Sequence, residues 1–440
     1  MHQRPRSTPV NSNTFSRRNF FAGALGVGAL LATTACGQSG GAAGSSAKIT
    51  WSTWGTPEEG QRFKKFNAQF KTDHPTITAT LQMVPSYSDY HSKLLTQLTS
   101  GTAPDVFYVG DDYIGKFVSS GVLMDLTPVV DGADAKVKLA DFNPALFGAG
   151  KTDKGLFALP NDCNPDVFWF DKKALAAAGI TENPADLAAA GIWTIETFLG
   201  MCAKLAAKGL HGAMFWNYWS THWSWVAANG GQVFDAAGKF VLPEDPKSVA
   251  AIKSLADGFT SKSFTVADTL PDGSGADSLF VSHKAGFYVQ GRYGIATAQQ
   301  SGSKDDYDIA PWPTVSGKPG SSGVAASYLV INAKTKAADA AKTFVGDFLS
   351  AKGQTLRLAD GGNAVPSVKG ADSVVLDGNY PAHAKSFLDM TSAGFEDFAV
   401  EAKVPGLSSD VSTAMLGMYQ GKTSPADTIT AVSKLMQKAV

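Results

Sequence analysis

The sequence is poor in cysteine and histidine, which narrows the kinds of site it can carry. Only three cysteines occur among the 440 residues, Cys36, Cys163 and Cys202, and their spacing matches no zinc or redox motif. The seven histidines are scattered and form no HxxxH or HExxH pattern. We therefore expect no metal, no cofactor and no catalytic residue. A Cys163–Cys202 disulfide is one alternative, but two buried free thiols are expected.

An excess of charge of either sign is also lacking. The formal net charge is -1 and only 18% of the residues are charged, so no field attracts nucleic acid or an anionic membrane surface. Hydrophobic residues make up 44% of the chain, which is enough for large cores. Because single cores stop growing at roughly 250–300 residues, the chain is predicted to fold as two lobes.

No hydrophobic run is long enough to span a membrane. The run from Phe20 to Ala32 has 13 mostly apolar residues, too few for a bilayer core of about 30 Å. It follows Arg17-Arg18, so residues 1–36 are predicted to be a twin-arginine signal peptide. Thr33-Thr34-Ala35-Cys36 resembles a lipoprotein cleavage box, which implies lipidation of Cys36.

This box departs from the usual lipoprotein pattern at one position. Thr33 stands where Leu is usual, and plain cleavage after Ala35 without a lipid is the alternative. Residues 37–47 are rich in Gly, Ala and Ser and are predicted to be a flexible tether. The chain is thus expected to be exported and lipid-anchored on the outer face of the cytoplasmic membrane.

Strands and helices alternate after the tether. Strands are predicted at 48–54, 77–84 and 105–109, and helices between and after them at 57–70, 89–100 and 114–119. Such βαβαβ alternation favours a parallel sheet covered by helices, so the fold class is α/β. Ligands of such sheets bind beyond the carboxyl ends of the strands, which here are residues 54–58 and 110–113.

A second set of elements follows in the rest of the chain. Further strands are predicted at 156–160, 167–170, 285–289 and 328–332, and further helices at 172–178, 193–208, 247–260 and 337–349. Helices are expected to dominate from residue 382 onward.

Several segments then resemble one known family. They are Ala103–Asp112, Gly121–Pro128, Gly155–Pro160, Trp169–Ile180, Trp193–Phe198, Lys284–Phe287, Gly291–Tyr293, Pro311–Pro313 and Gly361–Ser367. In order and spacing they resemble the extracellular (family 1) sugar-binding proteins of ABC importers. Phe170-Asp171 departs from the usual Tyr-Asn, and Tyr293 stands where Trp is usual.

The resemblance implies the two-lobe periplasmic-binding-protein type II fold, with the ligand in a cleft between the lobes. Its N-terminal lobe would comprise residues 48–158 and 314–352, and its C-terminal lobe residues 159–313 and 353–440. The crossings between lobes are expected near residues 158–162, 311–317 and 350–356.

Candidate ligand-binding residues supply flat rings and hydroxyl-binding groups, the two features that a sugar requires. Trp54 and Tyr293 are predicted to stack on the ligand, and one of Trp219 and Trp223 to reach the cleft. These Trp residues belong to a cluster of four with Trp216 and Trp225. The predicted hydroxyl-binding residues are Glu58, Asp111, Asp112, Asp162 and Arg292.

Each candidate has a structural alternative. The tryptophans could be buried core, and Asp111 or Asp112 could cap a helix. Asp162 could form a turn before Pro165, Glu58 could complement a helix dipole, and Arg292 could form an ion pair that locks the lobes.

The predicted function is capture of a mono- or oligosaccharide by hinge closure and its delivery to the permease subunits of an ABC importer. The protein is expected to be a monomer that is not an enzyme and binds no nucleic acid. A secreted glycosidase, a surface adhesin, and importer binding proteins for glycerol phosphate or polyamine remain alternatives. The acidic candidates argue against anionic ligands.

Overall fold

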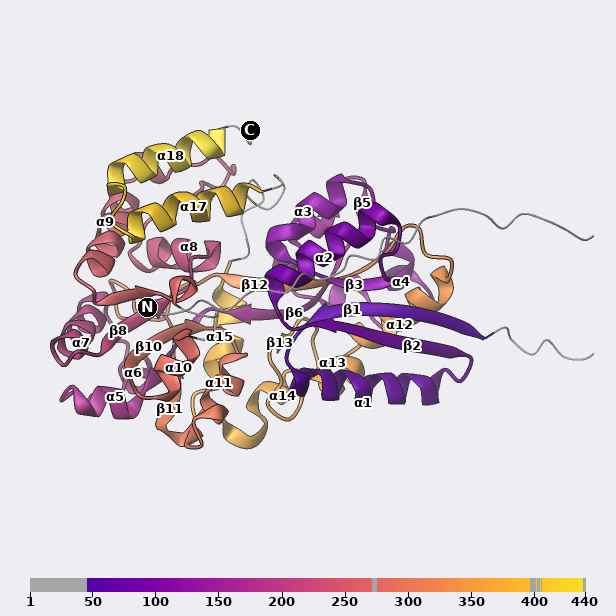
Figure 1. Ribbon diagram of the computed structural model, residues 1–440, viewed down its shortest axis with the longest axis horizontal. Helices are drawn as coiled ribbons and strands as arrows, with labels where there is room; N and C mark the ends of the chain where they lie inside the picture. Colours follow the sequence, from indigo (N-terminus) through magenta and orange to yellow (C-terminus); the bar gives the residue numbers. More distant parts are fainter. Residues whose placement is uncertain (1–45, 271–274, 396–400, 402–403, 405, 438–440) are drawn as a thin grey trace, which may run out of the picture. The chain divides into compact units, whose positions relative to one another are not determined.

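Two open β-sheets form the frame of the protein. The computed structural model describes residues 46–270, 275–395, 401, 404 and 406–437 (Figure 1). The predicted signal peptide with Cys36 and nearly all of the tether lie outside the described residues. One sheet has six strands and the other has five, and a two-stranded ribbon pairs β4 (Lys151–Thr152) with β5 (Gly155–Leu156).

The six-stranded sheet has the order β13-β6-β12-β3-β1-β2. β1 (Ala47–Trp54) is parallel to both β2 (Ile77–Val84) and β3 (Val106–Gly110), which confirms the predicted parallel βαβαβ unit. Three more strands extend the sheet, each antiparallel to the strand it pairs with. The alternation along the chain did not predict this feature. The three strands are β12 (Val324–Ile331), β6 (Leu159–Pro165) and β13 (Val365–Pro366).

Local signals explain the first helix, α1 (Pro57–Asp73). The Thr56 side chain accepts a hydrogen bond from the backbone N–H of Glu59, whose carboxylate accepts one in return from the N–H of Thr56, a capping box. Phe63, Phe66 and Phe70 are buried at helical spacing. The helix therefore begins where predicted, runs three residues further than predicted and packs its apolar face on the sheet.

The five-stranded sheet has the order β11-β7-β10-β8-β9. Its strands are β7 (Val167–Asp171), β8 (His211–Phe215), β9 (Phe264–Val266), β10 (Ala285–Gln290) and β11 (Tyr307–Ala310). β8, β9 and β10 are parallel to one another, and β7 is antiparallel to both β10 and β11. β8, β9 and β11 were not predicted from the sequence.

The chain passes from the first sheet to the second at Asp166. β6 ends at Pro165 in the first sheet, and β7 begins at Val167 in the second. The chain returns between β11 and β12. β6 and β13 pair in the first sheet, yet their residues fall in the ranges predicted for the C-terminal lobe. The exact lobe boundaries stay a prediction.

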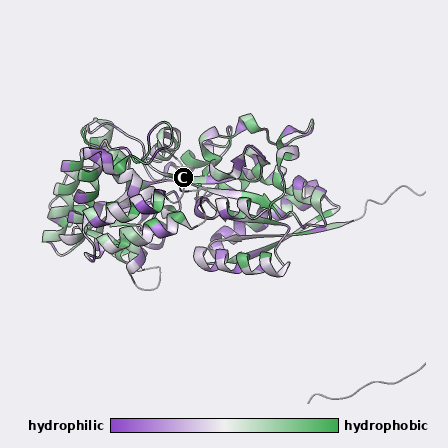
Figure 2. Cartoon of the chain, turned by 90° about the horizontal axis from the view of Figure 1, so that it is seen from above, coloured by the Kyte–Doolittle hydropathy of each residue, from purple (hydrophilic) through white to green (hydrophobic). Residues whose placement is uncertain are grey.

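The remaining helices cover the sheets and carry both apolar and polar residues (Figure 2). The helices that flank the strands of the first sheet along the chain are α2 (Tyr87–Ser100), α3 (Asp111–Ser119), α4 (Thr127–Asp131), α12 (Ala338–Leu349) and α13 (Ala351–Leu358). The others are α5 (Lys172–Ala177), α6 (Pro184–Ala189), α7 (Ile195–Ala207), α8 (Trp219–Ala228), α9 (Pro246–Thr260), α10 (Gly275–Val281), α11 (Gly294–Gln300), α14 (Ser373–Leu376), α15 (Lys385–Ala393), α17 (Leu407–Tyr419) and α18 (Pro425–Gln437). Within the described ranges, none of the helices combines the length and the apolar character needed to cross a membrane.

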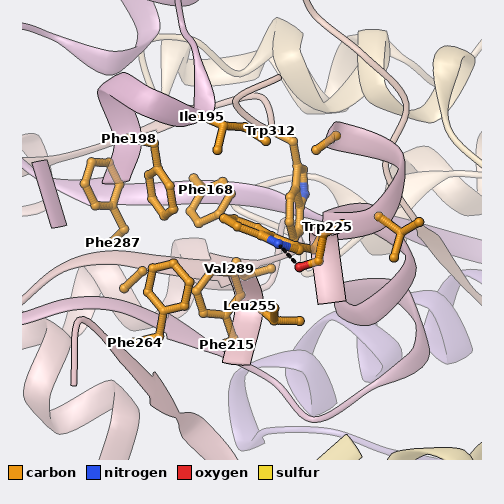
Figure 3. Close-up of a cluster of buried hydrophobic side chains, with 14 of the residues drawn as sticks. Phe168, Ile195, Phe198, Phe215, Trp225, Leu255, Phe264, Phe287, Val289 and Trp312 are labelled. Carbon is orange, nitrogen blue, oxygen red and sulfur yellow. Dashed lines mark hydrogen bonds between the residues drawn. The ribbon is translucent and has the colours of Figure 1, made fainter. Parts of the chain in front are cut away.

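Each sheet packs on an aromatic core. In the second lobe, Phe168, Phe198, Phe215, Trp225 and Phe264 meet edge to face or at a tilt (Figure 3). Such contacts add about 0.5–1.5 kcal/mol per pair to the burial of the rings. Cys163 and Cys202 are free and buried, which confirms the expected pair of thiols.

Candidate ligand-binding site

The topology brings several polar and aromatic side chains to one edge of the second sheet. β8, β9 and β10 are parallel, so their carboxyl ends share an edge. The residues that follow these ends are 216–218, Asp268 and Tyr293. Because β7 is antiparallel to β10, it begins at the same edge, where Asp166 precedes it.

The first sheet presents its own carboxyl edge at the same crossing. β1 ends at Trp54 and β3 at Gly110, and β6 runs parallel to β3 because both are antiparallel to β12. β6 therefore ends at this edge, and the next residue is Asp166. The crossing thus joins the carboxyl edges of both sheets, where ligands of α/β folds bind. We call this region the joined edges.

Asp111 links the two lobes at the joined edges. Its carboxylate accepts a hydrogen bond from the hydroxyl of Tyr218, a residue that directly precedes α8 in the second lobe. It also accepts one from the N–H of Ala326 on β12 at 3.1 Å. The neighbouring Asp112 accepts from the hydroxyl of Tyr87. Gly110 occupies the N-cap of α3, so neither aspartate caps the helix as the structural alternative proposed.

Trp54 lies in an aromatic group on the first lobe. Its half-buried ring meets Tyr87 edge-on at 4.9 Å between centroids and His91 at 5.3 Å. The His91 Nε2 accepts from the N–H of Gly110 at 3.1 Å, so its Nδ1–H donates to the carbonyl of Tyr87. Burial lowers the pKa of His91 to about 4, which keeps the ring neutral at physiological pH.

The second lobe contributes the facing aromatic group. Tyr293 is 36% exposed, and the half-buried ring of Trp216 lies 5.8 Å from that of Tyr288. Desolvation of the Tyr293 hydroxyl, followed by the charges of Asp166, Asp277 and Asp268, raises the pKa of Tyr293. Neither Trp216 Nε1 nor the Tyr288 hydroxyl has a hydrogen-bond partner among the described residues. Buried polar atoms of this kind usually have one, so a bound molecule is a natural partner.

Three carboxyl groups near the crossing hold protons more tightly than usual. Burial raises the pKa of Asp111 to about 6. It raises that of Asp112 to about 7, with a further contribution from the charge of Asp111. Burial and the charge of Asp111 likewise raise the pKa of Asp166 to about 7, although Ser220 Oγ donates to Asp166 at 2.6 Å.

Trp219 and Trp223 belong to the core. They are 0% and 1% exposed, and Trp223 Nε1 donates to the Glu401 carboxylate at 2.8 Å. Their helix, α8, packs its tryptophans into the second lobe, so neither ring is available to a ligand in this structure. Trp216, which precedes α8, is half-buried and follows the end of β8 at the joined edges.

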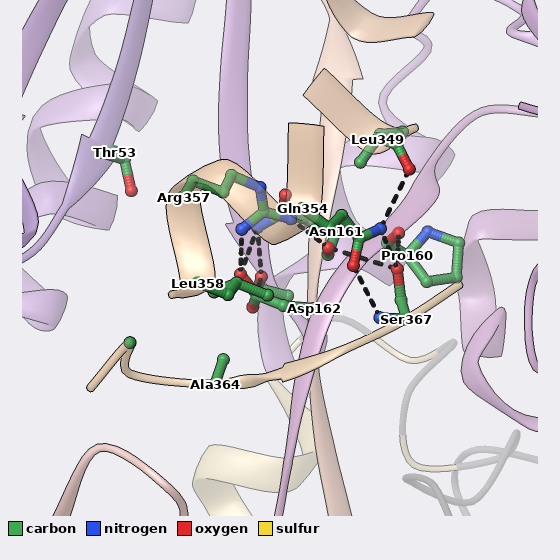
Figure 4. Close-up of polar contacts among 12 residues, drawn as sticks. Thr53, Pro160, Asn161, Asp162, Leu349, Gln354, Arg357, Leu358, Ala364 and Ser367 are labelled. Carbon is green, nitrogen blue, oxygen red and sulfur yellow. Dashed lines mark hydrogen bonds and ion pairs between the residues drawn. The ribbon is translucent and has the colours of Figure 1, made fainter. Parts of the chain in front are cut away.

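Asp162, a predicted hydroxyl-binding residue, forms a buried ion pair. Its carboxylate accepts from Arg357 Nη1 at 2.8 Å, Asn161 Nδ2 at 2.9 Å and Ser327 Oγ at 2.6 Å (Figure 4). The Arg357 guanidinium also lies over the ring of Phe348, 4.6 Å from its centroid. Asp162 thereby ties β6 to α13 and has a structural role.

Arg292 is likewise structural. It is 1% exposed, and its guanidinium donates to four backbone carbonyls at 2.6 to 3.1 Å, those of Leu358, Gly362, Ala364 and Val374. It holds the chain after α13 in place and forms no ion pair within the described ranges. Glu58 is exposed in the first turn of α1 and remains free to meet a ligand.

Sequence reasoning missed Tyr87, Asp166, Tyr218, Asp268 and Tyr288. Asp166 could have been found from its place directly before a predicted strand. Tyr218 could have been found from the apolar run 212–215, which lies in β8. Tyr87 and Tyr288 depend on how elements pack, so the sequence carried no signal for them. No three His, Cys, Asp or Glu side chains in the described part of the chain are grouped to hold a metal ion.

Comparisons with known proteins agree with this architecture. A family model described as bacterial extracellular solute-binding protein matches residues 54–355. The diacetylchitobiose binding protein of Streptomyces coelicolor is 25% identical over 358 residues, which cover 78% of this chain and 79% of the relative.

Solved structures show the same fold. An ABC substrate-binding protein from Listeria monocytogenes, in complex with cycloalternan, aligns with a TM-score of 0.78 at 19% identity over 90% of this chain and 99% of its own. A receptor of Streptomyces glaucescens, solved without ligand and with acarbose, aligns with a TM-score of 0.74 at 21% identity over 90% and 98% of the two chains. The likeness confirms the two-lobe α/β fold.

Proposed function

The chain belongs to the bacterial extracellular solute-binding protein family, and from this we propose that it binds a carbohydrate for import by an ABC transporter. The relative from Streptomyces coelicolor is named for a disaccharide, and both structural neighbours were solved with saccharide-type ligands. These names support the choice of a sugar over other solutes.

The observation that carries the proposal is the pairing of rings with carboxylates at the joined edges. Trp54 and Tyr87 lie on one side, and Trp216, Tyr218 and Tyr293 on the other. Aromatic faces cover the C–H faces of sugars, and carboxylates form strong hydrogen bonds with hydroxyls. Asp112 accepts from Tyr87 of the first set and Asp111 from Tyr218 of the second, and Asp166 lies where the chain crosses between the sheets.

Function would follow from closure of the lobes. A sugar held from both sides stabilises the closed form only if it makes more contacts there than in the open form. The segments that cross between the sheets would act as the hinge, and the permease subunits would bind the closed form. A monomer suffices for this mechanism.

The N-terminal sequence supports an extracytoplasmic location. Arg17-Arg18 and the apolar run to Ala32 are typical of twin-arginine export, and Cys36 would carry the lipid. A lipid and a tether would keep the lobes near the permease while leaving them free to move.

A thermal-shift screen against neutral and modified sugars tests the carbohydrate proposal. A bound sugar raises the melting temperature by mass action, by an amount that grows with concentration. Replacing Tyr293→Ala should abolish most of the shift. The control Val315→Ala, at a side chain that is 62% exposed in the second lobe, should retain it. Stabilisation by amino acids or peptides and by no sugar would contradict the proposal.

The same mixtures distinguish a binding protein from a glycosidase. After long incubation, chromatography should recover the sugar that binds unchanged. Steady release of smaller saccharides, lost on replacing Asp111→Asn or Asp112→Asn, would instead favour the enzyme. A shift with glycerol phosphate or spermidine alone would favour the other two ligand classes.

A further inference from the structure

Five carboxyl groups at the joined edges have no basic partner in the part of the chain that the structure describes. They are Asp111, Asp112, Asp166, Asp268 and Asp277. No ion pair within the described ranges involves any of the five. By contrast, Asp162, which is as buried as Asp111 and Asp166, is paired with Arg357 at 2.8 Å. Asp112 and Asp277 are half-buried, and Asp268 is exposed.

Among the described residues, the hydrogen-bond partners of these carboxyl groups are neutral. Asp111 and Asp112 accept from tyrosine hydroxyls, and Asp166 accepts from Ser220. Asp268 accepts from the N–H of Asn217 at 2.6 Å, and Asp277 from Gln290 Nε2 at 3.2 Å. A buried carboxylate without a cation is costly, which is why the pKa values of Asp112 and Asp166 rise to about 7.

A second observation points to a bound molecule at this place. Tyr288 is 0% exposed, and its hydroxyl has no hydrogen-bond partner in the described part of the chain. Gln290, which donates to Asp277 at 3.2 Å, lies two residues further along β10, so its side chain shares a face of the sheet with that of Tyr288. Burial and then the charge of Asp277 raise the pKa of Tyr288. Its ring lies beside Trp216, and with Tyr293 these aromatic faces attract cations.

The unpartnered atoms also define what the rest of the ligand must offer. Trp216 Nε1 is only a donor, so it needs an acceptor oxygen. The ammonium groups of a polyamine are only donors, whereas a sugar hydroxyl accepts. The carboxylates and the aromatic faces favour a positive charge on the ligand, and the Trp216 indole favours an acceptor such as a hydroxyl oxygen. A molecule that has both is therefore expected.

We propose that the ligand is an amino sugar, a mono- or oligosaccharide in which a protonated amine replaces at least one hydroxyl and lies at the edge of the second sheet that carries Asp166, Asp268 and Asp277. The inference rests on the proposed function and names the ligand class of the same site. The positive charge that neutralises the carboxylates at the joined edges would come from the ligand.

Calorimetric titration of the full chain with three matched disaccharides tests this inference. Cellobiose, chitobiose and N,N′-diacetylchitobiose share one linkage and differ at carbon 2, which carries a hydroxyl, an amine or an acetamide. At pH 7 and low salt, chitobiose should bind at least about tenfold more tightly than the other two. The preference should shrink as salt rises, because mobile ions screen charges that solvent can reach. Glucose and glucosamine provide the same comparison for a smaller ligand.

Matched variants locate the charge that recognises the amine. Asp166→Asn should reduce the preference for the amine over the hydroxyl form to less than about threefold. Asp257→Asn removes one negative charge from a surface pair with Lys253 and should leave the preference unchanged. The ratio of the two affinities is the readout, because a general loss of folding would weaken both ligands alike.

The outcomes separate this inference from the proposed function. Equal or tighter binding of the neutral sugars overturns the amino-sugar inference and leaves the carbohydrate proposal standing. Binding of spermidine or calcium ions with no response to any sugar overturns the carbohydrate proposal, and no binding across the whole panel contradicts both. A tenfold preference that Asp166→Asn does not reduce overturns the assignment of the charge to these carboxylates.

Discussion

At the scale of single residues, the clearest distinction is between aspartates that hold the fold together and aspartates that face the joined edges. Asp162 and Asp111 both follow predicted strands, 156–160 and 105–109, so the sequence alone did not distinguish them. The structure gives Asp162 a buried guanidinium and gives Asp111 only neutral donors. Whether an arginine 195 residues away along the chain reaches an aspartate depends on tertiary packing, which local patterns do not carry.

Asp162→Ala should therefore destabilise the protein strongly. Removal of one partner leaves the 1% exposed Arg357 charged and unpaired, which costs about 3–5 kcal/mol. Urea unfolding followed by tryptophan fluorescence measures the loss. The matched carboxylate variant Glu58→Ala, at an exposed position, should change stability by less than about 0.5 kcal/mol. Similar midpoints for the two variants would contradict the assignment of Asp162 to the fold.

Asp166 should make stability depend on pH. Its pKa in the folded protein is about 7, above the usual 3.8, so the folded state binds more protons than the unfolded state between these values. Its contribution is fully present below pH 3.8 and is lost as the pH rises through 7.

Unfolding at pH 4.5 and pH 7.5 measures this effect. Each pKa unit corresponds to about 1.4 kcal/mol, so the decline in the free energy of unfolding should be smaller by at least about 1 kcal/mol in Asp166→Asn than in the parent. Equal declines in both proteins would show that Asp166 does not titrate in this range.

At the scale of elements, four tryptophans that are close in the sequence lie in two different places, the joined edges and the core. Trp216 follows β8, whereas Trp219, Trp223 and Trp225 lie on α8 and are buried. Trp225→Ala should cost about 3–5 kcal/mol of stability, because its ring fills the second-lobe core. Trp216→Ala should cost less and should remove most of the sugar-induced thermal shift. Both quantities come from the same melting experiment, and a retained shift in Trp216→Ala would exclude this residue from the site.

The elements also show what a sequence can predict. β1 to β3 and the helices between them follow from the alternation of apolar runs along the chain, and so does the position of Trp54, Asp111 and Asp112 at strand ends. β8 and β9 are only five and three residues long. Four consecutive residues of β8 are buried, which removes any alternation, and β9 is too short to show one. Without β8, the end of that strand and hence the roles of Trp216 and Tyr218 could not be predicted.

At the scale of the whole molecule, the Tyr218–Asp111 hydrogen bond joins the lobes across the joined edges. Tyr218→Phe removes the bond and should shift the protein toward a more open arrangement. Small-angle scattering should then give a larger radius of gyration without ligand. Tyr380→Phe is the matched control, because its hydroxyl donates to the carbonyl of Lys304 within the second lobe. An unchanged radius in Tyr218→Phe would mean that the bond does not hold the lobes together.

The central claim is that a sugar is captured between two hinged lobes. Small-angle scattering of the chain, with and without the sugar that gives the largest thermal shift, tests it most directly. The account predicts that the radius of gyration falls as the sugar saturates the protein, and that Trp216→Ala abolishes the fall. Saturable binding of the sugar with no change in the radius of gyration would contradict the claim.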